Sequence, residues 1–163
     1  MISWILTKVA IGEYLDAVNE EALKQNEIDC ILSLRGGEAE DSSIEEENIC
    51  FNLGITFFRV PIFDRGYWCK HDNNEEQVNV KLQLKTAAYM LDLLADRFKR
   101  ILVHCTGGID RAPFVVALHM SKMELEYQDD YVLSRTDLAF WVDKAYKFIK
   151  EKRPQIIRHM EWV

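Results

Sequence analysis

Apolar positions along the chain fall first into short, nearly continuous runs of the kind that form buried strands. Residues 29–34, 55–63 and 100–105 are three such runs. Residues 3–12 mix polar and apolar positions, which indicates short strands at a sheet edge or in a hairpin. In the run 55–63 we expect Pro61 and a polar loop reaching to about Gln77 to end the strand.

A second pattern, with apolar positions at steps of three and four, indicates amphipathic helices. The clearest stripe contains Leu84, Ala87, Ala88, Leu91, Leu94 and Phe98. Residues 16–26 have helix-forming composition, and a largely apolar helix is expected over 112–123. A last helix should begin at Thr136 or Asp137 and stop at Pro154.

Strands that alternate with helices predict an α/β fold, with a mostly parallel central sheet flanked by helices on both sides. A chain of 163 residues can bury one proper core, so we expect a single domain spanning residues 1–163. Ligands of such sheets bind at the carboxyl ends of the strands. The residues that follow the run 100–105 are therefore the first place to look for a site.

Composition and charge narrow the range of partners. The formal net charge is -7 at pH 7, whereas nucleic acids and anionic membranes attract basic surfaces. We therefore expect neither a nucleic acid nor a membrane as partner. Residues 38–47 carry six carboxylates and are predicted to form a solvated turn or helix face.

The cysteines lie far apart, at Cys30, Cys50, Cys69 and Cys105, with no Cys-x-x-Cys pair. This spacing is typical neither of a zinc site nor of a disulfide framework, so we expect no bound metal and a reducing compartment. No stretch approaches the roughly 20 apolar residues that cross a bilayer. The N-terminal apolar segment is too short for a secretory signal. The sequence therefore predicts a cytoplasmic protein.

The segment "HCTGGIDR", residues 104–111, carries the candidate chemistry. Successive backbone N–H groups in a tight loop, followed by a helix N-terminus, form a concavity for an anion. Gly107 and Gly108 allow backbone angles that a side chain would forbid. Arg111 can present two parallel donors to phosphate oxygens, and the same positive surroundings would keep Cys105 as a nucleophilic thiolate. The expected phosphate-binding residues are Thr106, Gly107, Gly108, Ile109, Asp110 and Arg111.

This segment fits the His-Cys-x-x-Gly-x-x-Arg signature of the cysteine-dependent protein tyrosine phosphatase superfamily. Residues 11–34, 54–64 and 151–154 resemble, in the expected order, the other segments of small dual-specificity phosphatases. The resemblance implies a monomeric phosphatase that uses no cofactor. Its substrates would be proteins phosphorylated on tyrosine, serine or threonine, and Cys105 would form a cysteinyl-phosphate. It also implies that His104 shapes the surroundings of Cys105 rather than transferring a proton.

A general acid must protonate the leaving oxygen, and two aspartates compete for this role. Asp64, in "VPIFDRG", matches the acid-loop aspartate of the resembled family in context and is our preferred catalytic acid. Asp72 lies at the more usual spacing before Cys105 but in a poorer context. In the same segment, Tyr67 and Trp68 could line the pocket rim or cover the core. Cys69 could pair with an oxidised Cys105.

Two loop positions depart from the pattern of the resembled family. Ala112 stands where most members carry Ser or Thr, which implies a slow hydrolysis of the cysteinyl-phosphate. Asp110 places a carboxylate in an anion-binding loop and must point outward to avoid repelling the ligand. Alternatives therefore stay open. The substrate could be a glucan, a sugar phosphate or an RNA 5′ end, or the chain could be a catalytically weak phospho-binding scaffold.

Overall fold

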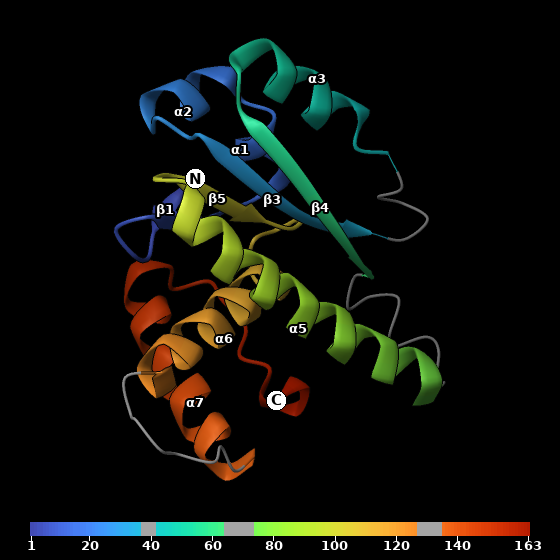
Figure 1. Ribbon diagram of the computed structural model, residues 1–163, viewed down its shortest axis with the longest axis vertical. Helices are drawn as coiled ribbons and strands as arrows, with labels where there is room; N and C mark the ends of the chain where they lie inside the picture. The colour runs from blue at the N-terminus through green and yellow to red at the C-terminus, as the bar shows by residue number, and fades with distance from the viewer. Residues whose placement is uncertain (37–41, 64–73, 127–134) are drawn as a thin grey trace.

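A twisted sheet of five strands, in the order β1-β2-β5-β3-β4, forms the centre of the described residues. The computed structural model describes residues 1–36, 42–63, 74–126 and 135–163 (Figure 1). The strands are β1 (Ser3–Trp4), β2 (Val9–Gly12), β3 (Cys30–Gly36), β4 (Thr56–Phe63) and β5 (Ile101–His104). β1 pairs antiparallel with β2, whereas the pairs β2–β5, β5–β3 and β3–β4 are parallel. The predicted, mostly parallel sheet is confirmed.

The register of the three inner strands brings the carboxyl ends of β2 and β5 together, beside β3, which continues to Gly36. Gly12 of β2 lies opposite His104 of β5, and His104 lies opposite Ser33 of β3. Cys105 follows His104 directly, so it leaves the sheet at the centre of this edge. Because β5 is the middle strand, whatever follows it has neighbours on both sides.

Helices cover the two faces of the sheet (Figure 1). One face carries α1 (Tyr14–Ala17), α2 (Glu20–Gln25) and α3 (Ile44–Leu53). The other carries α5 (Asn74–Arg97), α6 (Arg111–Glu126) and α7 (Arg135–Lys152), and the chain closes with the short helix η2 (Met160–Trp162). Within the described residues, none of these helices is long and apolar enough to cross a membrane.

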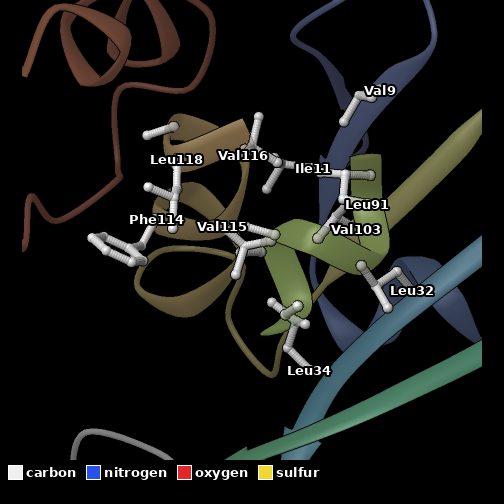
Figure 2. Packing of buried hydrophobic residues seen from close by; sticks show 14 of the residues in the cluster. Val9, Ile11, Leu32, Leu34, Leu91, Val103, Phe114, Val115, Val116 and Leu118 are labelled. Atoms are coloured by element: carbon white, nitrogen blue, oxygen red, sulfur yellow. The ribbon is translucent and has the colours of Figure 1, made fainter. Parts of the chain in front are cut away.

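Alternation along the strands divides the core into two clusters, since successive side chains point to opposite faces. Ala10, Ile31 and Leu102 face α1–α3, whereas their strand neighbours, such as Ile11 and Val103, face α5–α7. The predicted stripe of α5 lies in the larger cluster, where Figure 2 shows Leu91 beside Ile11 and Val103. Periodicity alone was therefore sufficient to identify the buried face of this helix.

Two element boundaries and one predicted exposure differ from the sequence expectations. β4 continues through Pro61 to Phe63, because β4 is an edge strand in the described sheet and its register with β3 shifts here, a position where a proline is tolerated. α5 begins at Asn74, inside the segment expected to be loop. In the acidic segment, Glu45 and Glu47 are exposed as predicted, but Glu46 is 1% exposed, so the prediction of a wholly solvated face was wrong.

Leu91→Ala should destabilise the fold, because a fully buried leucine leaves a cavity that the surrounding side chains fill only in part. We expect a loss of about 2–5 kcal/mol in the free energy of unfolding. Leu93→Ala, on the exposed side of the same helix, is the matched control and should change it by less than about 0.5 kcal/mol. Urea denaturation followed by circular dichroism measures both, and equal losses would contradict the assignment of the buried face.

Candidate active site

Cys105 lies at the carboxyl end of β5, and α6 begins six residues later at Arg111. The intervening loop adopts the sharp turn that the sequence predicted, but only one of its two glycines has a left-handed backbone. Gly108 has φ 62°, where an L-residue would be strained. A Cβ on Gly108 would also lie 2.3 Å from the carbonyl oxygen of Gly12.

Gly107 does not fill the role that we expected for it. Its φ lies outside the left-handed region, and a Cβ there would make only ordinary contacts with the side chain of Ile109. The requirement for glycine in this loop therefore rests on Gly108, which must fit between the end of β2 and the C-terminal segment of the chain.

The guanidinium of Arg111 is buried at 2% exposure and joins the loop to two strands. Its Nη1 donates to the carbonyl oxygens of Ile62 at 2.7 Å and Leu34 at 3.3 Å, near the ends of β4 and β3. Its Nη2 donates to Oγ1 of Thr106 at 3.3 Å. The arginine thus reaches back from the end of the loop to Thr106, the first residue after Cys105.

The outer half of the loop is held, residue by residue, by the end of the chain. Nε of Arg153 donates to the carbonyl oxygen of Gly108 at 2.9 Å. The amide of Ile157 donates to the carbonyl oxygen of Ile109 at 2.8 Å. Nε2 of His159 lies 2.6 Å from Oδ1 of Asp110. The carboxylate of Asp110 is therefore directed at His159.

Arg153 also ties the loop to the N-terminus, because its Nη1 donates to the carbonyl oxygen of Met1 at 2.7 Å and to Ser3 Oγ at 3.0 Å. Burial lowers the pKa of Arg153, against the opposing carboxylates of Asp16 and Glu13. Sequence reasoning noted the "EKRP" segment only as a likeness and missed this role. An arginine directly after an amphipathic helix carries no local sign of burial.

His104 lies behind the cysteine and faces a buried carboxylate. It is fully buried, with Nδ1 3.3 Å from the carbonyl oxygen of Cys105 and Nε2 2.8 Å from Oε1 of Glu46. Arg35 donates to the second oxygen of Glu46 at 3.0 Å. Burial by itself would raise the pKa of Glu46, but His104 and Arg35 hold that pKa below its ordinary value. This geometry agrees with a supporting role for His104.

The same network continues from Arg35 to the surface beside the loop. The Arg35 guanidinium lies 3.8 Å from the centroid of the Tyr14 ring, and the Tyr14 hydroxyl donates to Glu45. The backbone amide of Tyr14 donates to the carbonyl oxygen of Thr106 at 3.0 Å. Arg35 and Tyr14 therefore flank the start of the loop, although nothing in the sequence marked either as part of a site.

The other two described cysteines differ from Cys105 in position. Cys30 and Cys50 are buried in the two core clusters, and burial raises the pKa of Cys30 to about 12 and that of Cys50 to about 11. Both are therefore protonated thiols at neutral pH. Cys105 is buried in the larger cluster as well, at 2% exposure, but it differs from them because it begins the loop that Arg111 closes. Five residues named in the sequence analysis lie outside the described residues: Asp64, Asp72, Tyr67, Trp68 and Cys69.

Two curated phosphatases resemble the chain in sequence. The chain is 22% identical over 155 residues to the tyrosine-protein phosphatase vhp-1 of Caenorhabditis elegans, covering 95% of this chain and 19% of the relative. It is 26% identical over 152 residues to human dual specificity protein phosphatase 16, covering 93% of this chain and 18% of the relative. The chain therefore spans less than a fifth of the length of these curated relatives.

The fold itself recurs in solved structures. The Yvh1 phosphatase domain from Chaetomium thermophilum superposes with a TM-score of 0.65 at 18% identity, covering 99% of this chain and 92% of that one. The family model for the dual specificity phosphatase catalytic domain matches residues 9–163, which include β2, the loop after β5 and the C-terminal segment that holds it. With nearly the whole chain matched, the protein belongs to the dual specificity phosphatase family.

Proposed function

We propose that this chain is a cysteine-dependent phosphatase that hydrolyses phosphate monoesters on tyrosine, serine and threonine of proteins. One observation carries the proposal. Cys105 stands at the end of the central strand, and the buried guanidinium of Arg111 closes the loop that follows it. Such a loop can hold a phosphate beside a sulfur nucleophile. We propose that residues 1–163 form this one catalytic domain.

In the first step, the thiolate of Cys105 attacks phosphorus. The sulfur–phosphorus bond forms as the bond to the ester oxygen breaks, and the leaving oxygen takes a proton from a carboxylic acid. The amides from Thr106 to Arg111 and the Arg111 guanidinium would hold the other three oxygens and spread their charge. In the second step, water attacks phosphorus, gives its proton to the same carboxylate, and the thiolate leaves. No cofactor enters this sequence.

We propose Asp64 as this acid. It directly follows Phe63, the last residue of β4, and the carbonyl oxygen of Ile62 accepts a hydrogen bond from Arg111. Arg111 therefore contacts the backbone at Ile62, two positions before Asp64. Asp72 remains the alternative, because loops accept insertions readily.

Electrostatics support the loop as an anion site. α6 has 16 residues and begins at Arg111, so its positive N-terminal end points at the loop. Ala112 is fully buried and offers no hydroxyl to assist departure of the thiolate. This favours slow hydrolysis of the cysteinyl-phosphate and, as a second candidate function, a weakly catalytic module that binds phosphorylated partners.

We further propose a cytoplasmic, monomeric protein that acts on phosphorylated proteins rather than on nucleic acids or membranes. The support is physical. The described cysteines Cys30, Cys50 and Cys105 are free thiols, as in reducing compartments. The net charge of -7 opposes binding to polyanions.

Cys105→Ser should lower turnover of an aryl phosphate by at least about a thousandfold, because a hydroxyl is a far weaker nucleophile than a thiolate here. Cys50→Ala, which removes a buried thiol of α3, should keep most of the activity. Initial rates with a chromogenic aryl phosphate measure both. Equal rates for Cys105→Ser and the unchanged chain would refute the mechanism. Turnover absent from the unchanged chain, with phosphopeptide binding retained, would favour the binding module.

Asp64→Asn should lower kcat by about a hundredfold or more on phosphoserine peptides, whose leaving alkoxide needs a proton. The loss should be much smaller on an aryl phosphate with an acidic phenol. Asp72→Asn is the matched control and should leave both rates within a few-fold. The opposite pattern would assign the acid to Asp72.

Gly108→Ala should weaken activity strongly, because the new Cβ would lie 2.3 Å from the Gly12 carbonyl oxygen in a left-handed backbone. Gly107→Ala meets only ordinary contacts and should keep activity within a few-fold. Steady-state kinetics, with circular dichroism to verify folding, distinguish the two. Similar losses at both positions would show that the loop needs both glycines.

A further inference from the structure

The last residues of the chain close over the loop from outside. Residues 153–163, here called the C-terminal segment, bond to the consecutive loop residues Gly108, Ile109 and Asp110 through Arg153, Ile157 and His159. Trp162 of this segment packs edge-on against Phe114 of α6, with ring centroids 5.4 Å apart, which places η2 beside α6 (Figure 1). The segment is thus anchored to the helix that follows the loop as well as to the loop itself.

Of the three loop residues in this contact, only Asp110 has a charged side chain. It is the last loop residue before Arg111, and its carboxylate carries the same sign as the phosphate dianion that the loop is expected to bind. In a partly buried site, two like charges a few ångströms apart repel strongly. The direction and the charge balance of the Asp110 side chain therefore affect how well the loop binds an anion.

The hydrogen-bond partners of His159 determine the protonation state of its ring. It is 1% exposed, with Nε2 2.6 Å from Asp110 and Nδ1 2.7 Å from Glu161 of η2. A carboxylate only accepts, and a neutral imidazole has a single N–H, so hydrogen bonds at both nitrogens require the imidazolium. The Trp162 ring stacks on the imidazole at 3.9 Å.

The other neighbours of His159 agree with a charged ring. From α7, the Tyr146 hydroxyl accepts from the His159 backbone amide, and burial raises the pKa of this tyrosine, so it stays neutral. Arg158, in the same segment, pairs with Asp143 of α7 at 2.8 Å. Burial alone would lower the pKa of His159, but Asp110 and Glu161 raise it above its ordinary value.

We infer that His159 is a positioning residue for the phosphate loop: its imidazolium holds the Asp110 carboxylate against the C-terminal segment and offsets its charge, so that the loop can bind a doubly charged anion. The inference rests on the proposed function only in requiring that the loop bind phosphate-like anions. It requires no particular rate of turnover.

The direction in which anion affinity changes with pH follows from the His159–Asp110 pair. A histidine with a raised pKa keeps its proton below that pKa and loses it as the pH rises through it. Anion affinity should therefore fall as the pH rises through the His159 titration. Sulfate is the suitable probe, because it stays doubly charged throughout this range. The Cys105→Ser background removes the sulfur nucleophile from the loop, so the experiment measures binding alone.

The test is a cycle of four proteins, all carrying Cys105→Ser: the parent, His159→Gln, Asp110→Asn, and the double variant. Calorimetry with sulfate near neutral pH should show about tenfold weaker binding for His159→Gln. The double variant should regain the parent affinity, because the carboxylate that needed offsetting is gone. Tyr146→Phe, which loosens the segment but leaves both charges, is the matched control and should stay within about twofold.

A second readout does not depend on affinity. Nuclear magnetic resonance titration of the His159 ring should give a pKa above the ordinary histidine value in the parent and a lower one in Asp110→Asn. A His159 pKa that Asp110→Asn leaves unchanged would overturn the inference even if all variants bind sulfate.

The remaining outcomes are equally decisive. If the double variant stays as weak as His159→Gln, the histidine merely supports the fold of the segment and the inference is wrong. Parent-like binding by His159→Gln overturns it too, as does the absence of sulfate binding by the parent. Turnover of an aryl phosphate by the unchanged chain would in each case still uphold the proposed function, so the two can fail separately.

Discussion

The close approach of two glycines, Gly12 at the end of β2 and Gly108 in the loop, is the constraint on which this site depends. No side chain fits between them, and Gly108 must adopt a left-handed backbone to make the approach. The loop packs against β2, and the carbonyl oxygens of Gly108 and Ile109 point outward, where they accept hydrogen bonds from Arg153 and from the Ile157 amide. An anion would need the loop N–H groups to point in the opposite direction, inward.

Three buried charged side chains lie in or near this loop. Arg111, Arg153 and Glu46 are each at most 2% exposed, and each has charged or polar partners at hydrogen-bond distance. Burying an ion is unfavourable unless its partners replace the lost water. Well-packed apolar side chains would give comparable stability at such positions. The buried ions are therefore better explained by the need to position the loop than by the need to stabilise the fold.

Much of the fold could be predicted because its signals are local. The stripe of α5 and the apolar run of β5 are each read from adjacent turns or alternate positions of one segment, and both proved correct. Expectations failed where a distant element decided the outcome. Gly107 looked as necessary as Gly108 until Gly12 was seen to approach only one of them. Glu46 looked solvated like Glu45 and Glu47, but α3 packs against the sheet and directs that one carboxylate to His104.

The sequence by itself determined the order of strands and helices and the residues of the loop, because the spacing of Cys105, the glycines and Arg111 is a property of one short segment. Only the tertiary structure decided what holds that loop. Arg153, Ile157 and His159 lie about 45 to 50 positions further along the chain than the residues they bind. Contacts between segments so far apart depend on how the helices pack on the sheet, and no local pattern of side chains records that packing.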